Sequence, residues 1–497
     1  MSAGTPDHVG KLDRIFAGGL AWSAAAKSVT QLLSWASVLI AARLLSPADF
    51  GLTGMAGAFV GITNVLAEFG IGSAVLQMQE LERDVLAQIH AFACLLCTGI
   101  FLAGEAVSPA IAAFFKSEHL LPVLLVNNIT FVITGFQQVP MALLQRDMDY
   151  RRLSLSDAAM AGVQAVVTIA GALAGFRYWA LVAGVVAARI TGAALNFYWQ
   201  PIHFRTPHWN QIRIPVRMGG QIAISRLAWS TYTQSDGIVV GRMLGGSLLG
   251  IYQMALTLAS APAEKISTLI MRAAGPLFAK IQNDQALVRR YFLIIAETIA
   301  LLVLPLMLGL AVVAPDAIEV LLGSKWAAAA APLVWLSLFV AVRSMGTLSD
   351  QVLVSLRQTR FTMSMSLLNL AVMPVAFWLA SRWGLNAVSA AWLILSPVTI
   401  FPLILKLARS ARIGFRDIFA ALMPALVGTC AMLIAVAGVR VFQAGNAYTR
   451  LVTQLCVGAA AYSLVLMVPF RAKVLRYIRF LRSLRQPAPA DGLVLEP

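Results

Sequence analysis

Long apolar segments alternate with short polar links along most of this chain. An α-helix needs about 20 apolar residues to cross about 30 Å of hydrocarbon, and apolar segments of that order recur from residue 17 onward. The pattern predicts an all-α polytopic membrane protein with about fourteen spans, or twelve if two segments are re-entrant. The fourteen predicted spans are residues 17–42, 51–73, 85–108, 121–143, 156–176, 178–199, 218–241, 250–274, 291–314, 332–355, 363–380, 385–405, 418–440 and 450–470.

The composition agrees with this pattern. Hydrophobic residues make up 59% of the 497 residues and charged residues only 12%, whereas soluble domains carry about 25% charged residues. The net charge is +16, but most Lys and Arg lie in the links and in the C-terminal tail, which is typical of a membrane-topology signal. We therefore expect no separate soluble domain, no enzyme and no nucleic-acid binding.

The distribution of Lys and Arg also predicts the orientation. With a cytoplasmic N-terminus, the cytoplasmic segments hold about three times as many Lys and Arg as the opposite side, in agreement with the positive-inside rule. Both termini are then cytoplasmic. The polar residues 1–16 lead into an uncleaved first span, and the basic segment 471–485 is expected to lie along the anionic inner leaflet.

An internal repeat divides the chain. The segment VLIAARLLSPADFGLTGMA (38–56) pairs without gaps with GIVVGRMLGGSLLGIYQMA (237–255), always 199 residues apart. Six predicted spans lie between the copies, and an even number preserves sidedness, so the halves are expected to be parallel repeats. Parallel duplicated halves around a midplane site are a transporter architecture, although a duplicated protein without transport is the alternative.

The repeat and the span map together predict two six-helix lobes followed by two extra helices. The predicted parts are a cytoplasmic N-terminal segment (1–16), an N-lobe (17–199), a cytoplasmic inter-lobe linker (200–217), a C-lobe (218–405), spans 13 and 14 (418–470) and a basic cytoplasmic tail (471–497).

Several cations fall inside the predicted spans, where an ionisable side chain costs several kcal/mol and therefore indicates function. Snorkelling side chains or internal ion pairs are the alternative. Because four of these cations lie near mid-span in both lobes, we expect a shared site for an anionic ligand. The candidates are Lys27, Arg189, Arg226 and Arg343 near mid-span, with Lys265 and Arg272 nearer the cytoplasmic end.

Acidic residues in the spans offer a second kind of chemistry. Glu68, Asp236 and Asp350 are candidates for ion coupling. Cys94 and Cys97 have the spacing of a metal or redox pair, but they lie in an apolar segment without further ligands, so we expect them to pack as small hydrophobes. A phosphate loop of the GxxxxGK type is absent. We expect no cofactor and no metal.

The motif RLLSPADFG after the first span resembles the opening signature of bacterial polysaccharide flippases of the O-antigen and colanic-acid type. These belong to the superfamily that includes multidrug extruders and peptidoglycan-precursor flippases. The segments GIYQMALTLASAPAEKI, AGPLFAKIQND and LPLMLGLAVVAPDAIEVLLGSKW, and the stretch QVPMALLQRDMDYRRLS (138–154), are similar to the same family. The matching positions are Gly250, Tyr252, Ala255, Pro262, Pro276, Asp284, Pro305, Gly309, Gly323, Trp326 and Pro332.

The resemblance implies a fourteen-helix, two-lobed protein in the bacterial inner membrane. Its implied activity is to move an undecaprenyl-pyrophosphate-linked oligosaccharide to the outer leaflet by alternating access, for exopolysaccharide, capsule or O-antigen export. The implied partners are the lipid-linked oligosaccharide and, within a larger assembly, a polysaccharide polymerase and a chain-length regulator. A cation-coupled multidrug extruder and a non-transporting scaffold of a polysaccharide assembly complex stay open as alternatives.

Overall fold

The computed structural model describes residues 30–31, 33–78, 82–442 and 445–468. Within these ranges the chain is almost entirely helical and contains no strand. The elements are α2 (Pro47–Glu68), α3 (Ile71–Gln77), α4 (Arg83–Phe115), α5 (Leu120–Arg146), α6 (Tyr150–Leu173), α7 (Tyr178–Trp199), α8 (Trp209–Leu244), α9 (Gly246–Ile281), α10 (Gln285–Leu321), η1 (Ser324–Ala329), α11 (Ala330–Ser355), α12 (Thr359–Ala380), η2 (Ser381–Trp383), α13 (Leu385–Ile394), α14 (Ser396–Thr399), α15 (Phe401–Ser410), α16 (Phe415–Phe442) and α17 (Ala447–Met467).

The predicted all-α membrane architecture is confirmed. In the described part of the chain, 11 helical segments are long and apolar enough to cross a membrane, and a shorter apolar helix runs over Leu33–Leu44. Each predicted span from residue 51 onward overlaps one or more helices. The spans 51–73 and 385–405 are each interrupted by short breaks, and the last two residues of the span 450–470 lie outside the described residues. The charged helices α8 and α9 are not among the 11, and the predicted first span lies largely outside the described residues, so the count of fourteen stays a prediction.

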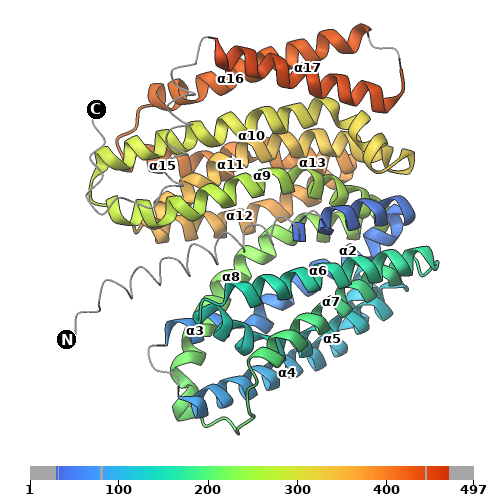
Figure 1. Cartoon of the computed structure of the whole chain (residues 1–497), viewed down its shortest axis with the longest axis vertical. Coiled ribbons are helices and arrows are strands. Elements are labelled where there is room, and N and C mark those ends of the chain that lie inside the picture. The colour runs from blue at the N-terminus through green and yellow to red at the C-terminus, as the bar shows by residue number, and fades with distance from the viewer. Residues whose placement is uncertain (1–29, 32, 79–81, 443–444, 469–497) are drawn as a thin grey trace. The chain divides into compact units, whose positions relative to one another are not determined.

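The chain forms two compact units (Figure 1). Unit 1 comprises residues 1–253 and 369–388, and unit 2 comprises residues 254–368 and 389–497. The chain passes between them inside helices α9, α12 and α13 rather than in loops. The lobe boundaries expected from the sequence stay a prediction.

In unit 1, α4, α5, α7 and α6 lie side by side, and α2 and α3 pack against α5 and α8 (Figure 1). The residue before α2 explains where that helix begins. The Ser46 hydroxyl accepts a hydrogen bond from the Asp49 backbone N–H, and the Asp49 carboxylate accepts one from the Ser46 N–H at 3.0 Å. This capping box, followed by Pro47 at the first helical position, satisfies orphan donors at the helix start. The motif SPAD thus fixes the start of α2.

The segment 200–208, which connects α7 to α8, is docked on the first turns of α4. The His208 backbone N–H donates to Gln88 Oε1 at 2.8 Å. The Phe204 ring lies with its centroid 4.9 Å from that of the buried His90 ring. This connection is therefore attached to α4 by a hydrogen bond and a ring contact, although most of its residues are exposed.

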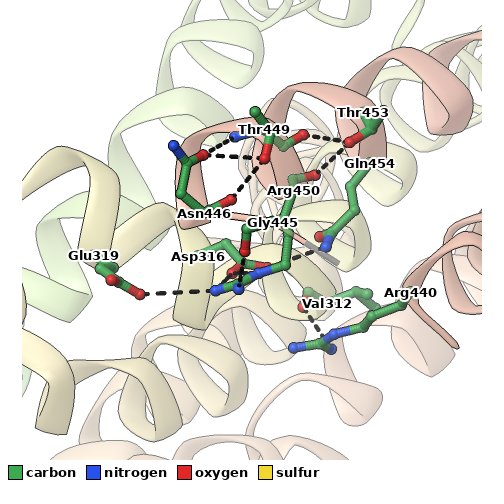
Figure 2. A network of polar contacts seen from close by, with 10 residues as sticks. All are labelled: Val312, Asp316, Glu319, Arg440, Gly445, Asn446, Thr449, Arg450, Thr453 and Gln454. Atoms are coloured by element: carbon green, nitrogen blue, oxygen red, sulfur yellow. Dashed lines mark hydrogen bonds and ion pairs between the residues drawn. The ribbon is translucent and has the colours of Figure 1, made fainter. Parts of the chain in front are cut away.

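In unit 2, α10 is the helix against which α11, α16 and α17 pack. The Arg450 side chain at the start of α17 donates to Asp316 Oδ1 of α10 at 2.9 Å, and Gln454 Nε2 donates to Asp316 Oδ2 at 3.1 Å (Figure 2). Near the opposite end of α10, Arg289 forms an ion pair with Asp417 at 2.8 Å. The two C-terminal helices are thus attached to α10 at both ends.

Candidate anion-binding site

A break in one membrane span creates the first part of the site. The apolar segment Pro47–Leu76 is interrupted where α2 ends at Glu68, because Phe69 (φ 40°) and Gly70 (φ 61°) both adopt the left-handed conformation. Such a break leaves backbone carbonyls that need partners inside a membrane. Gln138 Nε2 donates to the Ala67 carbonyl at 2.7 Å. A side chain of α5 therefore stabilises the break beside Glu68.

Two adjacent glycines allow α8 to approach this break. A Cβ atom at Gly219 would overlap the Phe69 carbonyl oxygen, and one at Gly220 would lie 3.2 Å from Phe69 Cζ. Glycine is thus required at position 219 for the close approach. The next turns of α8 then run beside α2, and the Ser230 hydroxyl lies 3.5 Å from the Gly61 carbonyl.

This approach brings two predicted site residues together. Arg226 Nη1 of α8 lies 3.5 Å from Glu68 Oε2, and both side chains are more than half exposed. The sequence suggested an anion-binding role for Arg226 and an ion-coupling role for Glu68. In the structure the two side chains form one ion pair at an accessible position, and both roles stay predictions.

A similar pair occurs in unit 2. Arg343 Nη2 of α11 donates to Glu264 Oε1 of α9 at 2.8 Å, with the arginine side chain 37% and the glutamate 60% exposed. The Arg343 guanidinium also lies 5.8 Å from the centroid of the Phe339 ring, which stacks on Trp392. A cation over an aromatic face is held in place by the ring quadrupole. Arg343 is therefore oriented but still accessible.

The remaining predicted cations differ in how far the structure describes them. Arg189 lies half-buried on α7, with no hydrogen bond or ion pair to any described residue. Lys265 is exposed on α9 beside Glu264. Lys27 and the side chain of Arg272 lie outside what the structure describes. Their anion-binding roles stay predictions.

The predicted ion-coupling acids have different environments. Asp236 of α8 is buried, and its carboxylate accepts hydrogen bonds from the Tyr252 hydroxyl and from the Gly237 backbone N–H, both at 2.6 Å. Asp350 of α11 is half-buried and forms no ion pair with the described residues. Glu68 is paired with Arg226. The three acids therefore do not form one cluster, and their coupling role stays a prediction.

Two side chains at the candidate site could not be singled out from the sequence. Glu264 was overlooked although it precedes the predicted cation Lys265, and a carboxylate beside a cation in a span is itself an indication of an ion pair. No sequence pattern indicated the role of Gln138, because its hydrogen-bond partner is a backbone carbonyl 71 residues away.

Cys94 and Cys97 both contact neighbouring groups of the protein. Cys97 is buried, and its Sγ lies 3.4 Å from the Ala67 carbonyl, whereas Cys94 Sγ lies 4.0 Å from His90 Nε2. Both thiols are free. Among the described residues no group of three His, Cys, Asp or Glu side chains is arranged to hold a metal ion.

Comparison with known proteins places the chain in a family. Residues 40–331, more than half of the chain, match the family model described as "Polysaccharide biosynthesis protein". The chain belongs to this family. The resemblance inferred from the motif RLLSPADFG and the segments after it is thereby confirmed at the level of the family.

Two curated relatives belong to bacterial polysaccharide pathways. Lipopolysaccharide biosynthesis protein WzxC of Escherichia coli (strain K12) is 23% identical over 321 residues, covering 62% of this chain and 63% of the relative. Succinoglycan biosynthesis transport protein ExoT of Rhizobium meliloti (strain 1021) is 26% identical over 314 residues, covering 62% of each chain. The chain thus spans less than two thirds of the length of either relative.

A solved structure shows the same fold. Lipid II flippase MurJ in an inward closed conformation has a TM-score of 0.72 over 91% of this chain and 99% of that one, at 12% sequence identity. A multidrug resistance transporter of the MATE family in an inward-facing conformation follows, with a TM-score of 0.62 over 77% of this chain and 96% of that one, at 13% identity. Likeness at these identities establishes the fold and leaves the substrate open.

Proposed function

We propose that this protein is a flippase that moves a lipid-linked oligosaccharide from the inner to the outer leaflet of a bacterial cytoplasmic membrane. The observation that carries the proposal is the family match over residues 40–331. The relatives named for lipopolysaccharide biosynthesis and succinoglycan transport support it. The product would serve exopolysaccharide, capsule or O-antigen export, alongside a polymerase and a chain-length regulator. The protein would act as a transporter rather than an enzyme, with both termini in the cytoplasm.

The proposed carrier of the oligosaccharide is undecaprenyl pyrophosphate. Its pyrophosphate is an anion, and a guanidinium group binds such an anion through two parallel hydrogen bonds. Arg226 and Arg343 each already hold a carboxylate at an accessible position. When the ligand binds, a phosphate oxygen would take the place of the Glu68 carboxylate on Arg226 or of the Glu264 carboxylate on Arg343. Lys27, Arg189, Lys265 and Arg272 are the further candidates for the ligand's charge.

We propose alternating access as the transport mechanism. Outward movement of two negative charges is favoured by the membrane potential, by about 2.3 kcal/mol per charge per 100 mV. Countercharges that move with the substrate reduce this contribution. Asp350 is the best placed of the three acids for an added ion coupling, because, unlike Glu68 and Asp236, it forms neither an ion pair nor a hydrogen bond with the described residues.

A cation-coupled drug extruder of the same fold is the alternative function. A cation carrier needs carboxylates that are available to cationic ligands. Glu68 and Glu264 are each paired with a guanidinium group, but such exposed pairs open at little cost, so the two functions are distinguished by experiment. A panel of cationic drugs, tested in a sensitive host, distinguishes this alternative, because raised resistance would favour it.

The direct test uses the purified full-length protein in proteoliposomes with a fluorescent undecaprenyl-pyrophosphate oligosaccharide. We expect a quencher that does not cross membranes to reach a larger fraction of the probe when the protein is present. A matched liposome without protein gives the baseline. Equal quenching in the two preparations would reject the proposed flippase activity. Unchanged flipping by the double variant Arg226→Gln/Arg343→Gln would reject the role of these residues in binding without rejecting the activity. Normal polymer export in cells by a protein that moves no lipid in proteoliposomes would favour the scaffold alternative.

A further inference from the structure

A small apolar cavity lies in unit 1 between α2, α4 and α8. Its volume is about 280 Å³, and every side chain that lines it is apolar. Sites that hold a whole small molecule are about 300–1,000 Å³ in volume, so this cavity has room for a segment of hydrocarbon rather than for a polar headgroup. The lining side chains include Phe59, Ile62, Ile111, Phe114, Phe115 and Ile238.

The cavity lies at the end of α4, where the chain reaches the membrane surface. Phe114 and Phe115 are the last two residues of α4, and residues 116–119 form the turn to α5. Because α4 and α5 are both long and apolar enough to span a membrane, the turn between them lies at the depth of the lipid headgroups. The Phe115 ring is buried, whereas Phe114 is 47% exposed. The cavity is therefore accessible close to the headgroups.

Arg242 of α8 brings a positive charge to this cavity. Its guanidinium lies 5.3 Å from the centroid of the Phe114 ring, and a cation over an aromatic face is held in place by the ring quadrupole. Gly241 explains the placement, because a Cβ atom there would lie 2.9 Å from Phe115 Cε1. The absence of a side chain at position 241 thus lets α8 approach the end of α4 with Arg242 beside the cavity.

This charge has no counterion in the part of the chain that the structure describes. The Arg242 side chain is half-buried and makes no ion pair there, whereas Arg226 and Arg343 each hold a glutamate. Lys116, directly after Phe115, is exposed and adds a second cation at the same end of α4. Basic side chains at headgroup depth attract anionic lipids, and a guanidinium binds phosphate by charge-assisted hydrogen bonds.

We propose that the cavity binds one acyl chain of an anionic phospholipid, whose phosphate lies against Arg242 and Lys116. The apolar lining offers nothing to hold a sugar, which favours a phospholipid of the bilayer over the lipid-linked oligosaccharide. The bound lipid is a fixed component of the protein and is not transported. The inference therefore goes beyond the proposed flippase function and does not depend on it.

The test is native mass spectrometry of the purified full-length protein with dioleoyl phosphatidylglycerol, and with dioleoyl phosphatidylcholine for comparison. One Lys or Arg near the membrane surface contributes about 1 kcal/mol to the binding of an anionic lipid, so we expect a preference of about fivefold or more for phosphatidylglycerol. Arg242→Gln should remove most of this preference. Arg382→Gln should keep it, because Arg382 also stacks on an aromatic ring, Trp378, but is not part of the cavity.

A second variant tests the hydrocarbon part of the site. Ala110 also lines the cavity, so Ala110→Trp should fill it and weaken phosphatidylglycerol binding although Arg242 is retained. Ala113→Trp is the matched control, because Ala113 is exposed on α4 but does not line the cavity. The losses in Arg242→Gln and Ala110→Trp should not add in the double variant, since one lipid contacts both positions. Thermal unfolding in detergent shows that each variant is folded.

Equal affinity of the wild type for the two phospholipids would overturn the proposal, as would equal losses in each variant and its control. Displacement of phosphatidylglycerol by glycerol phosphate at equal concentration would reveal an anion site that needs no chain. Displacement by undecaprenyl pyrophosphate would assign the cavity to the transported lipid. Either displacement would also overturn the phospholipid site. Because none of these measurements involves transport, their failure is distinct from a failure of the proposed flippase activity.

Discussion

The Glu68 carboxylate at the end of α2 lies 3.5 Å from the Arg226 guanidinium of α8, although the two side chains are 53% and 55% exposed. Ion pairs at such exposed positions contribute about 0–1 kcal/mol to stability. The pair therefore costs little to open. A ligand phosphate that takes the place of the carboxylate on Arg226 needs to overcome only this small interaction.

The variant Arg226→Gln should lower lipid-linked oligosaccharide transport at least tenfold, because the guanidinium is needed for the anionic ligand. The thermal unfolding midpoint should change little, since the lost ion pair is exposed. Proteoliposome flipping and thermal unfolding in detergent measure the two effects. The charge swap Glu68→Arg/Arg226→Glu is the control. A swap that restores full transport would show that the pair matters only as a structural contact.

A second prediction concerns the type of cation at Arg343. Lysine keeps the charge but loses the planar fork that binds a carboxylate or phosphate through two hydrogen bonds. Transport should therefore decrease in the order wild type, Arg343→Lys, Arg343→Gln. The measurement is the initial flipping rate at equal protein density. Arg382→Gln serves as the matched control, because Arg382 stacks on Trp378 outside the candidate site. An equal loss of transport in Arg382→Gln would show that the loss in the Arg343 variants comes from the change in net charge.

Much of the fold could be predicted because its cause is periodic in the sequence. Apolar segments of spanning length recur regularly, and each predicted span from residue 51 onward overlaps one or more helices. The 199-residue repeat aligns Gly51 with Gly250, but the close approach of their helices is known only from the structure. The start of α2 is also determined by local sequence, through the capping residues Ser46 and Asp49.

The candidate site was harder to predict because pairing across helices leaves no local pattern. Arg226 and Glu68 are 158 residues apart, and nothing near either one indicates the other. The break after Glu68 also depends on Gly219 of a distant helix and on Gln138. The sequence therefore located the charges but not their partners.

A third prediction tests the break beside Glu68. Gln138→Met keeps the size of the side chain but removes the donor to the Ala67 carbonyl. The Ala67 carbonyl then keeps the weaker contact with Cys97 Sγ at 3.4 Å. An incompletely satisfied buried polar group costs up to about 1–3 kcal/mol, so the thermal midpoint should fall. Gln145→Met is the matched control on α5, because the Gln145 side chain makes no hydrogen bond to the described residues. Equal midpoints for the two variants would show that Gln138 does not support the break.

A fourth prediction concerns the attachment of the two C-terminal helices. The Asp316 side chain is only 5% exposed, and Arg450 supplies its charge partner while Gln454 supplies a further hydrogen bond (Figure 2). Removal of one partner of a buried ion pair costs about 3–5 kcal/mol. Arg450→Ala should therefore lower the thermal midpoint clearly and expose α16 and α17 to proteases. Arg440→Ala should do less, because Arg440 makes one exposed hydrogen bond, to the Val312 carbonyl.

The double variant Asp316→Asn/Arg450→Gln separates charge from contact at this attachment. It removes both charges together, and a neutral hydrogen-bonded pair avoids the uncompensated carboxylate that Arg450→Ala leaves behind. The double variant should therefore recover most of the stability lost in the single variant, as measured by thermal unfolding of the purified protein. If it is as unstable as Arg450→Ala, the guanidinium stabilises α17 through its other contacts, with the Gly445 carbonyl at 2.9 Å and with Glu319 Oε2 at 3.9 Å, and not by compensating the buried charge of Asp316.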